Sequence, residues 1–237
     1  MLQIDLHVHT LFSLCGIHTV MELLEQARML GMKGLAITDH GLTIGGRLNS
    51  PFFERFQSPY PDIKVLKGIE CNILDEDGTV DLPPAFMQWI DVVLAGIHPN
   101  IEKGLGRERY TDMVIAAIEK NPSIDIISHP NDPAYPVDYL RLARSAKIKG
   151  VALELNNSKI LYKRSSVEDT ISLIEACRDT GCSMAVCSDT HAILELGRDD
   201  SVKPLLVKAS FPEELIVTHT AESTLAFIDS RKKNKHC

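Results

Sequence analysis

Asp5-Leu6-His7-Val8-His9-Thr10, close to the start of the chain, is the stretch that decides the fold. The alternation over residues 4–9 predicts a β-strand with apolar side chains on one face and Asp5, His7 and His9 on the other. Two imidazoles on one face at the end of a buried strand suit a pair of metal ligands, because neutral histidine binds zinc, iron and related ions. Hydrogen-bonded core histidines would give the same pattern, so the metal interpretation depends on the rest of the chain.

Length and charge limit the classes of protein to consider. The chain has 237 residues, of which 44% are hydrophobic, and this suits one domain over residues 1–237. The formal net charge is -7, which argues against a groove for long duplex nucleic acid. The one basic run, residues 231–235, is expected to be a solvated, frayed end.

The sequence indicates a cytoplasmic setting and no membrane partner. Met1 leads directly into a strand, without the basic and apolar regions of a signal peptide. No apolar run approaches the roughly 20 residues that span a bilayer. The six cysteines contain no Cys-x-x-Cys pair and no disulfide-like framework, and several lie in apolar runs as small buried side chains.

Polar residues repeatedly follow short apolar strands. They recur every 27 to 33 residues, at His9, His40, Glu70, His98, His129, Asn156 and Asp189. This spacing is the length of one strand–helix unit, so the residues mark the carboxyl ends of parallel strands. All the strand ends share one mouth only in a closed barrel, which predicts an irregular α/β barrel of seven or eight strands. An open doubly wound sheet is the alternative.

The segments between these strands give further expectations. Thr19 to Glu22 is a capping-box pattern for a helix, and another helix is expected over residues 107–121. A third helix is expected to open near Pro136, and a fourth near Ser165 or Ser166 with Val167 facing inward. Residues 41–61 form a long polar segment and therefore a candidate substrate loop.

Six of the nine histidines lie at predicted strand ends, together with three acids. The histidines are residues 7, 9, 40, 98, 129 and 191, and the acids are Asp39, Glu70 and Asp189. So many polar groups would make a costly core unless positive ions lay among them, and their number predicts two or three ions. Cys15, in the loop after the first strand, fits a ligand or a structural thiol.

Five further residues can be interpreted from their surroundings. His18 precedes a helix cap and fits a solvated residue, although it could also ligate a metal ion. His219 lacks acidic neighbours, and His236 belongs to the tail. Asn156 is a candidate for contacting the substrate or supporting a ligand, and Glu154 is expected to be its partner inside the barrel.

These motifs together resemble the PHP (polymerase and histidinol phosphatase) superfamily. The matching stretches are Asp5–Thr10, Ile37–His40, Gly68–Glu70, Gly96–His98, Ser128–Pro130, Glu154–Ser158 and Ser188–His191. The full length is similar to the stand-alone, YcdX-like phosphatase branch. The resemblance implies an irregular, TIM-like (β/α)7 barrel with a trinuclear zinc, manganese or iron site at the carboxyl ends of its strands.

The resemblance also implies a set of ligands. His7, His9, Glu70 and Asp189 would hold one ion, and Glu70 would bridge to a second ion held by His98 and His129. His40 and His191 would hold the third. Cys15 occupies the position where the family usually has a histidine, and its thiolate would favour zinc. His18 could replace Cys15, or the third site could be weak or empty.

The expected function is hydrolysis of a phosphate monoester by a metal-activated hydroxide. Glu70, Asp189 and His191 are expected to be catalytic, and Asn156, Lys163 and Arg164 to contact the substrate, with Arg47 a further phosphate-binding candidate. The substrate would be a small phosphorylated metabolite or a nucleotide, and the protein could form homo-oligomers. The alternatives are a PHP nuclease or nucleotide phosphatase acting on short oligonucleotides, a C–N hydrolase of the amidohydrolase type and a non-catalytic PHP module.

Overall fold

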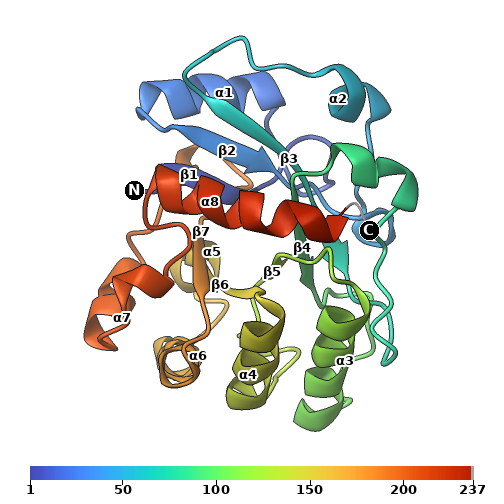
Figure 1. Ribbon diagram of the computed structural model, residues 1–237, viewed down its shortest axis with the longest axis vertical. Coiled ribbons are helices and arrows are strands. Elements are labelled where there is room, and N and C mark those ends of the chain that lie inside the picture. The colour runs from blue at the N-terminus through green and yellow to red at the C-terminus, as the bar shows by residue number, and fades with distance from the viewer. Residues whose placement is uncertain (236–237) are drawn as a thin grey trace.

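A computed structural model describes residues 1–235, so His236 and Cys237 lie outside the described residues. Seven parallel strands follow one another around a single sheet in the order of the chain (Figure 1). They are β1 (Ile4–Val8), β2 (Gly34–Ile37), β3 (Lys64–Asn72), β4 (Val92–Gly96), β5 (Ile126–Ile127), β6 (Ala152–Asn156) and β7 (Met184–Cys187). The predicted irregular (β/α)7 barrel is confirmed.

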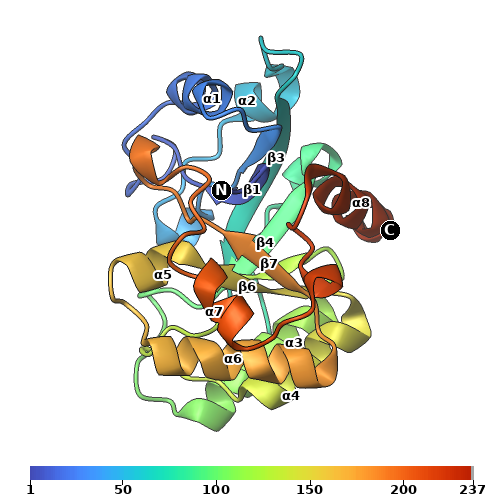
Figure 2. The same ribbon diagram turned by 90° about the vertical axis from the view of Figure 1, so that its left-hand side faces the viewer.

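Helices cover the outside of this sheet. They are α1 (Val20–Met29), α2 (Ser50–Arg55), α3 (Arg107–Lys120), α4 (Tyr139–Lys149), α5 (Asn157–Leu161), α6 (Val167–Thr180), α7 (Lys203–Lys208) and α8 (Ala221–Arg231). Figure 2 shows α1 and α2 on one side of the strands and α3, α4 and α6 on the opposite side. None of the helices in residues 1–235 combines the length and apolar character that crossing a membrane requires.

Short 3-10 helices replace regular helices at several places. They are η1 (Leu42–Ile44), η2 (Pro84–Trp89), η3 (Ile193–Glu195), η4 (Glu213–Leu215) and η5 (Lys232–Lys235). The connection from β3 to β4 has η2 and a bridge between Ile73 and Val80 but no α-helix, as expected from the absence of a helix pattern after Glu70. The segment 41–61, expected to be a loop, contains η1 and α2, and Asn49 caps α2 by accepting a hydrogen bond from the Phe52 backbone.

Small side chains alternate with larger ones such as Leu6 and Leu94 inside the barrel. Strands β2, β6 and β7 contribute Ala36, Ala152 and Ala185 to the buried interior cluster. At Gly68 a Cβ atom would lie 2.7 Å from the side chains of both Thr38 and Val92, so only glycine fits there. Seven strands enclose a narrow lumen, and these small residues match its width.

Helix α8 closes the amino-terminal end of the barrel. Its Ala221 and Ile228 pack against the interior cluster, and the Ala221 backbone N–H donates to the Gln3 side chain, next to β1. At its other end Arg231 lies 3.2 Å from Asp125, next to β5. The helix therefore spans the floor of the barrel from one strand to another (Figure 1).

A β-bulge in β1 interrupts the regular alternation that the sequence predicted for this strand. Asp5 pairs with Leu35 and Val8 with Ile37, so Leu6 and His7 together oppose one residue of β2. The extra residue reverses which positions face inward beyond it. Leu6 therefore packs in the interior cluster, while Asp5 faces away from the histidines and accepts hydrogen bonds from the Ser188 side chain and, at 3.0 Å, from the Gly197 backbone.

The barrel is nearly closed between β7 and β1. Near the mouth, the His9 backbone N–H donates to the Thr190 carbonyl at 2.8 Å. Near the floor, β7 instead contacts the segment after η4 through a bridge between Met184 and Ile216. This segment therefore occupies the lower part of the seam.

Two predicted helix features need correction. Helix α4 begins at Tyr139 rather than near Pro136, because the Asp138 side chain caps it by accepting from the Arg141 backbone. Val167, expected to face inward, is 39% exposed, because α6 begins there and its buried face starts one turn later. The capping box between Thr19 and Glu22 is present as predicted.

The basic run of residues 231–235 was expected to be a solvated, frayed end, and this is wrong for two of its residues. Arg231 and Lys235 are buried, and the Lys235 ammonium lies 2.7 Å from the Asp125 carboxylate. Arg231 also donates to three backbone carbonyls, including that of Ile124 at 2.7 Å. A buried carboxylate without such partners would be unfavourable, so these cations stabilise Asp125 at the barrel floor.

Candidate metal centre

The side chains predicted from the strand ends converge at the open mouth of the barrel. They are His7 in β1 and His9 directly after it, Cys15 and His40 from the loops after β1 and β2, Glu70 within β3, His98 and His129 after β4 and β5, and Asp189 and His191 after β7. Glu70 was expected at the end of its strand, but β3 continues to Asn72. Two of these residues have a left-handed backbone, His129 at φ 33° and Asp189 at φ 56°, a conformation found at functional sites.

His7, His9 and Asp189 form the first group of donor atoms. The Nε2 atoms of the two imidazoles lie 3.0 Å apart, and an Asp189 oxygen lies 3.3 Å from His9 Nε2. All three donor atoms are within 4.8 Å of one another. Burial alone would raise the pKa of Asp189, but His7 and the neighbouring histidines hold that pKa far below its usual range.

Glu70 connects this group to the other histidines. Its Oε2 lies 3.2 Å from His7 Nε2 and 2.9 Å from His40 Nδ1. Its Oε1 lies 3.2 Å from His98 Nε2 and 3.0 Å from His129 Nε2. The two oxygens thus face different histidines, which is the geometry that a bridging carboxylate requires.

Cys15 belongs to a third group with His9, His40 and His191, hereafter the Cys15 group. Their donor atoms also lie within 4.8 Å of one another, and this group is the most solvent-accessible of the three. Burial would raise the pKa of the Cys15 thiol, but hydrogen bonds with His191 and His40 lower this pKa to about 6. A thiolate is therefore available as a ligand near neutral pH.

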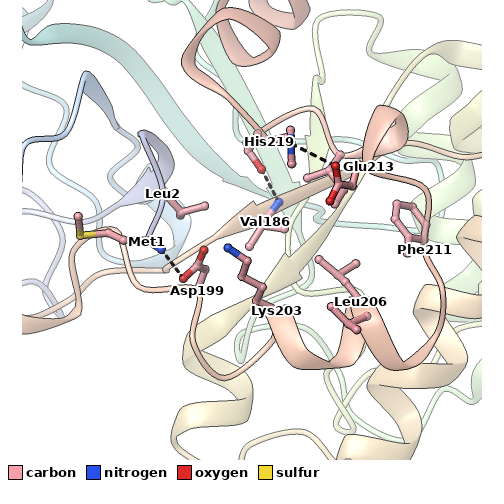
Figure 3. A pocket seen from close by; sticks show the side chains of 12 residues that line it. Met1, Leu2, Val186, Asp199, Lys203, Leu206, Phe211, Glu213 and His219 are labelled. Atoms are coloured by element: carbon pink, nitrogen blue, oxygen red, sulfur yellow. Dashed lines mark hydrogen bonds and ion pairs between the residues drawn. The ribbon is translucent and has the colours of Figure 1, made fainter.

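His18 and His219 lie outside these groups. None of the candidate metal clusters found in residues 1–235 includes His18. His219 lies 3.6 Å from Glu213 and lines a cavity of about 160 Å³ beside β7 and α7, together with Leu206 and Phe211 (Figure 3). That cavity contains none of the strand-end ligands.

Hydrogen bonds fix the orientation of four imidazoles. His7 Nδ1 lies 2.6 Å from Glu154, His9 Nδ1 lies 3.2 Å from Ser13 and His98 Nδ1 lies 3.2 Å from Asn72. His191 Nδ1 contacts the Asp189 carbonyl at 3.0 Å. A histidine held through one nitrogen presents the other to a metal ion, so each Nε2 is the available ligand atom.

Ser13 and Asn72 are the supporting residues that the sequence did not reveal. The Ser13 hydroxyl donates to Asp39 at 2.7 Å and accepts from the His40 backbone at 2.9 Å. Asp39 also accepts two hydrogen bonds from Thr10, so it holds the loop after β1 rather than joining the ligands. Neither Ser13 nor Asn72 has a sequence signal beyond its position near a strand end.

The donor set fits divalent cations. Among the predicted ligands, three buried atoms have no hydrogen-bond partner: His40 Nδ1, Glu70 Oε2 and His98 Nε2. The first two lie 2.9 Å apart, but without the geometry of a hydrogen bond. Burial lowers the pKa of His9 to about 3, so its imidazole is neutral and able to ligate. Unsatisfied buried donors and acceptors around one space fit the binding of a positive ion.

The pKa values of His40 and His7 support the same conclusion. Burial would lower the pKa of His40, but Glu70 and Cys15 raise it to about 10. The pKa of His7 is likewise well above its ordinary value because Glu70 and Glu154 outweigh the effect of burial. The carboxylates therefore attract positive charge to this site, and protons and metal ions compete for the same positions.

The predicted substrate-contacting residues lie at the end of β6, in the case of Asn156, and just after α5, in the case of Lys163 and Arg164. The Asn156 amide donates to Asp189 at 3.1 Å and to Glu154 at 3.0 Å, so it positions a ligand. Lys163 and Arg164 are exposed, and the Arg164 guanidinium lies 5.6 Å from the centre of the Tyr162 ring. Their contact with a substrate stays a prediction.

Comparisons with known proteins agree on one family. A family model described as PHP domain matches residues 5–181. A probable phosphatase of Caldanaerobacter subterraneus is 33% identical over 237 residues, covering 98% of this chain and 93% of the relative. Another from Shewanella loihica is 35% identical, covering 96% of this chain and 94% of the relative.

Solved structures show the same fold. Histidinol phosphate phosphatase from Lactococcus lactis, complexed with zinc, L-histidinol and phosphate, superposes with a TM-score of 0.67. The match covers 88% of this chain and 94% of that one, at 18% identity. At this identity the likeness concerns the barrel alone.

Proposed function

This chain belongs to the PHP domain family and is a metal-dependent phosphatase, and on that premise we propose that it hydrolyses a phosphate monoester at a centre of two or three divalent ions. The observation that supports this most is the position of Glu70, whose two carboxylate oxygens face different histidines within 3.2 Å. We also propose that residues 1–237 form one domain of this family.

The ligands are proposed in three sets. His7, His9, Glu70 and Asp189 would hold one ion, Glu70, His98 and His129 a second, and His40, His191 and Cys15 a third. Zinc is the proposed metal because imidazole and thiolate donors suit it, with manganese and iron as the alternatives. Bound divalent ions would lower the pKa of a water molecule and neutralise the phosphate oxygens.

The chain itself contributes orientation and exclusion of water. Glu154 holds His7, and Asn156 holds Asp189 at the bottom of the site. Glu70, with 1% exposure, places both carboxylate oxygens among the histidines. The Cys15 group forms the outer edge, where the substrate enters. Glu70, Asp189 and His191 are the proposed catalytic residues.

The proposed substrate is a small phosphorylated metabolite. The printed names of the relatives support the phosphatase class, and a nucleotide substrate is the alternative within it. We propose a reducing, cytoplasmic setting, supported by the free state of the cysteines in residues 1–235.

The test is hydrolysis of a generic aryl phosphate by the metal-loaded protein. Glu70→Ala and His98→Ala are expected to lower kcat by at least about 100-fold, because each removes a ligand. Glu175→Ala, an exposed change on α6, is the control and should keep full activity. Circular dichroism should show the same secondary structure in every variant. Undiminished hydrolysis by Glu70→Ala would overturn the assignment.

A further inference from the structure

Exposed apolar side chains surround the Cys15 group. Leu14 is 73% exposed, Ile17 62%, Leu42 60% and Leu194 78%, and each lies within three residues of a member of that group. We name these four residues, together with Tyr162, the apolar rim. Exposed apolar residues gathered at one place are typical of a binding surface rather than of a solvated loop.

Contacts between the loops place the members of the rim on one surface. The Ile17 backbone N–H donates to the His191 carbonyl at 3.2 Å, which joins the loop after β1 to the loop after β7. The loop after β1 also packs against the end of η1, which contains Leu42. A Cβ atom on Gly45, the residue that follows η1, would lie 2.8 Å from Leu14 Cδ1. Three separate loops thus meet at the opening of the centre.

Tyr162 extends the rim from a fourth loop. Its hydroxyl donates to the Glu195 side chain, next to Leu194 in η3, and Tyr162 as a residue is 50% exposed. Glu195 in turn accepts from the His191 backbone N–H at 2.7 Å. Glu195 therefore links Tyr162 to the predicted ligand His191, which lies three residues before Leu194.

The charges around the mouth suit a substrate with a single anionic group. Bound divalent ions would balance the phosphate, and the five rim side chains carry no charge. Lys159, buried at the start of α5, is already paired with Asp132 at 2.5 Å. The exposed Arg164, whose guanidinium lies 5.6 Å from the centre of the Tyr162 ring, is a cation beside the rim and a predicted contact of the substrate. The whole chain has a formal net charge of -7, which disfavours a polyanionic substrate.

We propose that the apolar rim binds the alcohol part of the substrate, so that the preferred phosphate monoester carries an apolar or aromatic group. This inference rests on the proposed phosphatase function. An ester whose phosphate reaches the buried donors must extend its alcohol part outward past the Cys15 group. There the rim residues lose contact with water, which favours an apolar group over a polyhydroxylated one.

The experiment compares n-butyl phosphate with glycerol phosphate, which have alkyl leaving groups and differ mainly in polarity. The wild type is expected to show about a tenfold higher kcat/KM for the butyl ester. Leu14→Ser and Leu194→Ser should each lower this ratio several-fold, chiefly through KM. Ile148→Ser is the matched control, because Ile148 is 80% exposed on α4, remote from the rim in the fold.

Metal content and molecular mass are measured on the same samples. Equal kcat/KM for the two esters, or an unchanged ratio in both rim variants, overturns the inference while the phosphatase function stands. A change of oligomeric mass in Leu194→Ser with an unchanged ratio also overturns it, because the rim would then bind a second copy. If the metal-loaded wild type hydrolyses neither these esters nor an aryl phosphate, the proposed function itself fails.

Discussion

Replacing Glu154 by glutamine tests how the centre is held without removing a ligand. The buried Glu154 carboxylate contacts His7 Nδ1 at 2.6 Å and accepts from the His129 backbone at 2.6 Å and the Asn156 amide at 3.0 Å. Glutamine keeps the volume but replaces one accepting oxygen by a donor. Either His7 or the His129 backbone then loses its acceptor. Loss of such a support weakens metal binding about 10- to 100-fold, or about 1.4–2.7 kcal/mol.

The assay is a titration of the metal-free proteins with zinc in competition with a chromophoric chelator. Glu154→Gln should release its weakened ion at lower chelator concentrations than the wild type, and activity should recover in excess zinc. Glu175→Gln, an exposed change of the same kind on α6, should bind zinc like the wild type. Equal zinc affinity for Glu154→Gln and the wild type would refute the argument that Glu154 orients His7.

Three further predictions concern the Cys15 loop and the barrel floor. In the metal-free protein, the rate of Cys15 alkylation should rise with pH with a midpoint at about 6, because the thiolate forms above that pKa. A midpoint near 9, or a fast phase that remains in Cys15→Ser, would contradict this. Lys235→Ala should lower the free energy of unfolding in urea by about 1–3 kcal/mol, since the buried Asp125 loses one of its two cations and keeps Arg231, whereas Lys232→Ala should change it by at most about 0.5 kcal/mol. Gly16→Ala would place a methyl carbon 2.2 Å from the Thr10 carbonyl oxygen, so the loop that carries Cys15 must shift and metal counting should find one ion fewer per chain. A full complement of metal ions would argue against this.

The sequence was sufficient for the barrel and for the residues around its mouth. Buried strands leave few places for histidine and carboxylate side chains, so their recurrence at strand ends identifies the mouth. The parallel order of strands then brings residues as distant as His7 and Asp189 to within 3.6 Å. The metal-binding roles of these residues stay predictions, although their positions are as expected.

Other features depend on contacts that no local pattern contains. The bulge at Leu6 and His7 follows from pairing with β2, so counting alternate residues assigned Asp5 to the wrong face. The burial of Lys235 depends on Asp125, which is far away in the sequence. A basic run is solvated unless a buried acid lies within reach, and that acid is visible only in the folded chain.

The closed floor of the barrel limits the routes by which molecules enter and leave the site. Side chains such as Leu6 and Leu94, each 0% exposed, fill the interior beneath the ligands, and α8 covers the opposite end. Water, substrate and products therefore share one entrance. The alcohol and the phosphate must leave past the rim by which the ester arrived, so a retained phosphate occupies the place of the next substrate. Inorganic phosphate should accordingly compete directly with the ester.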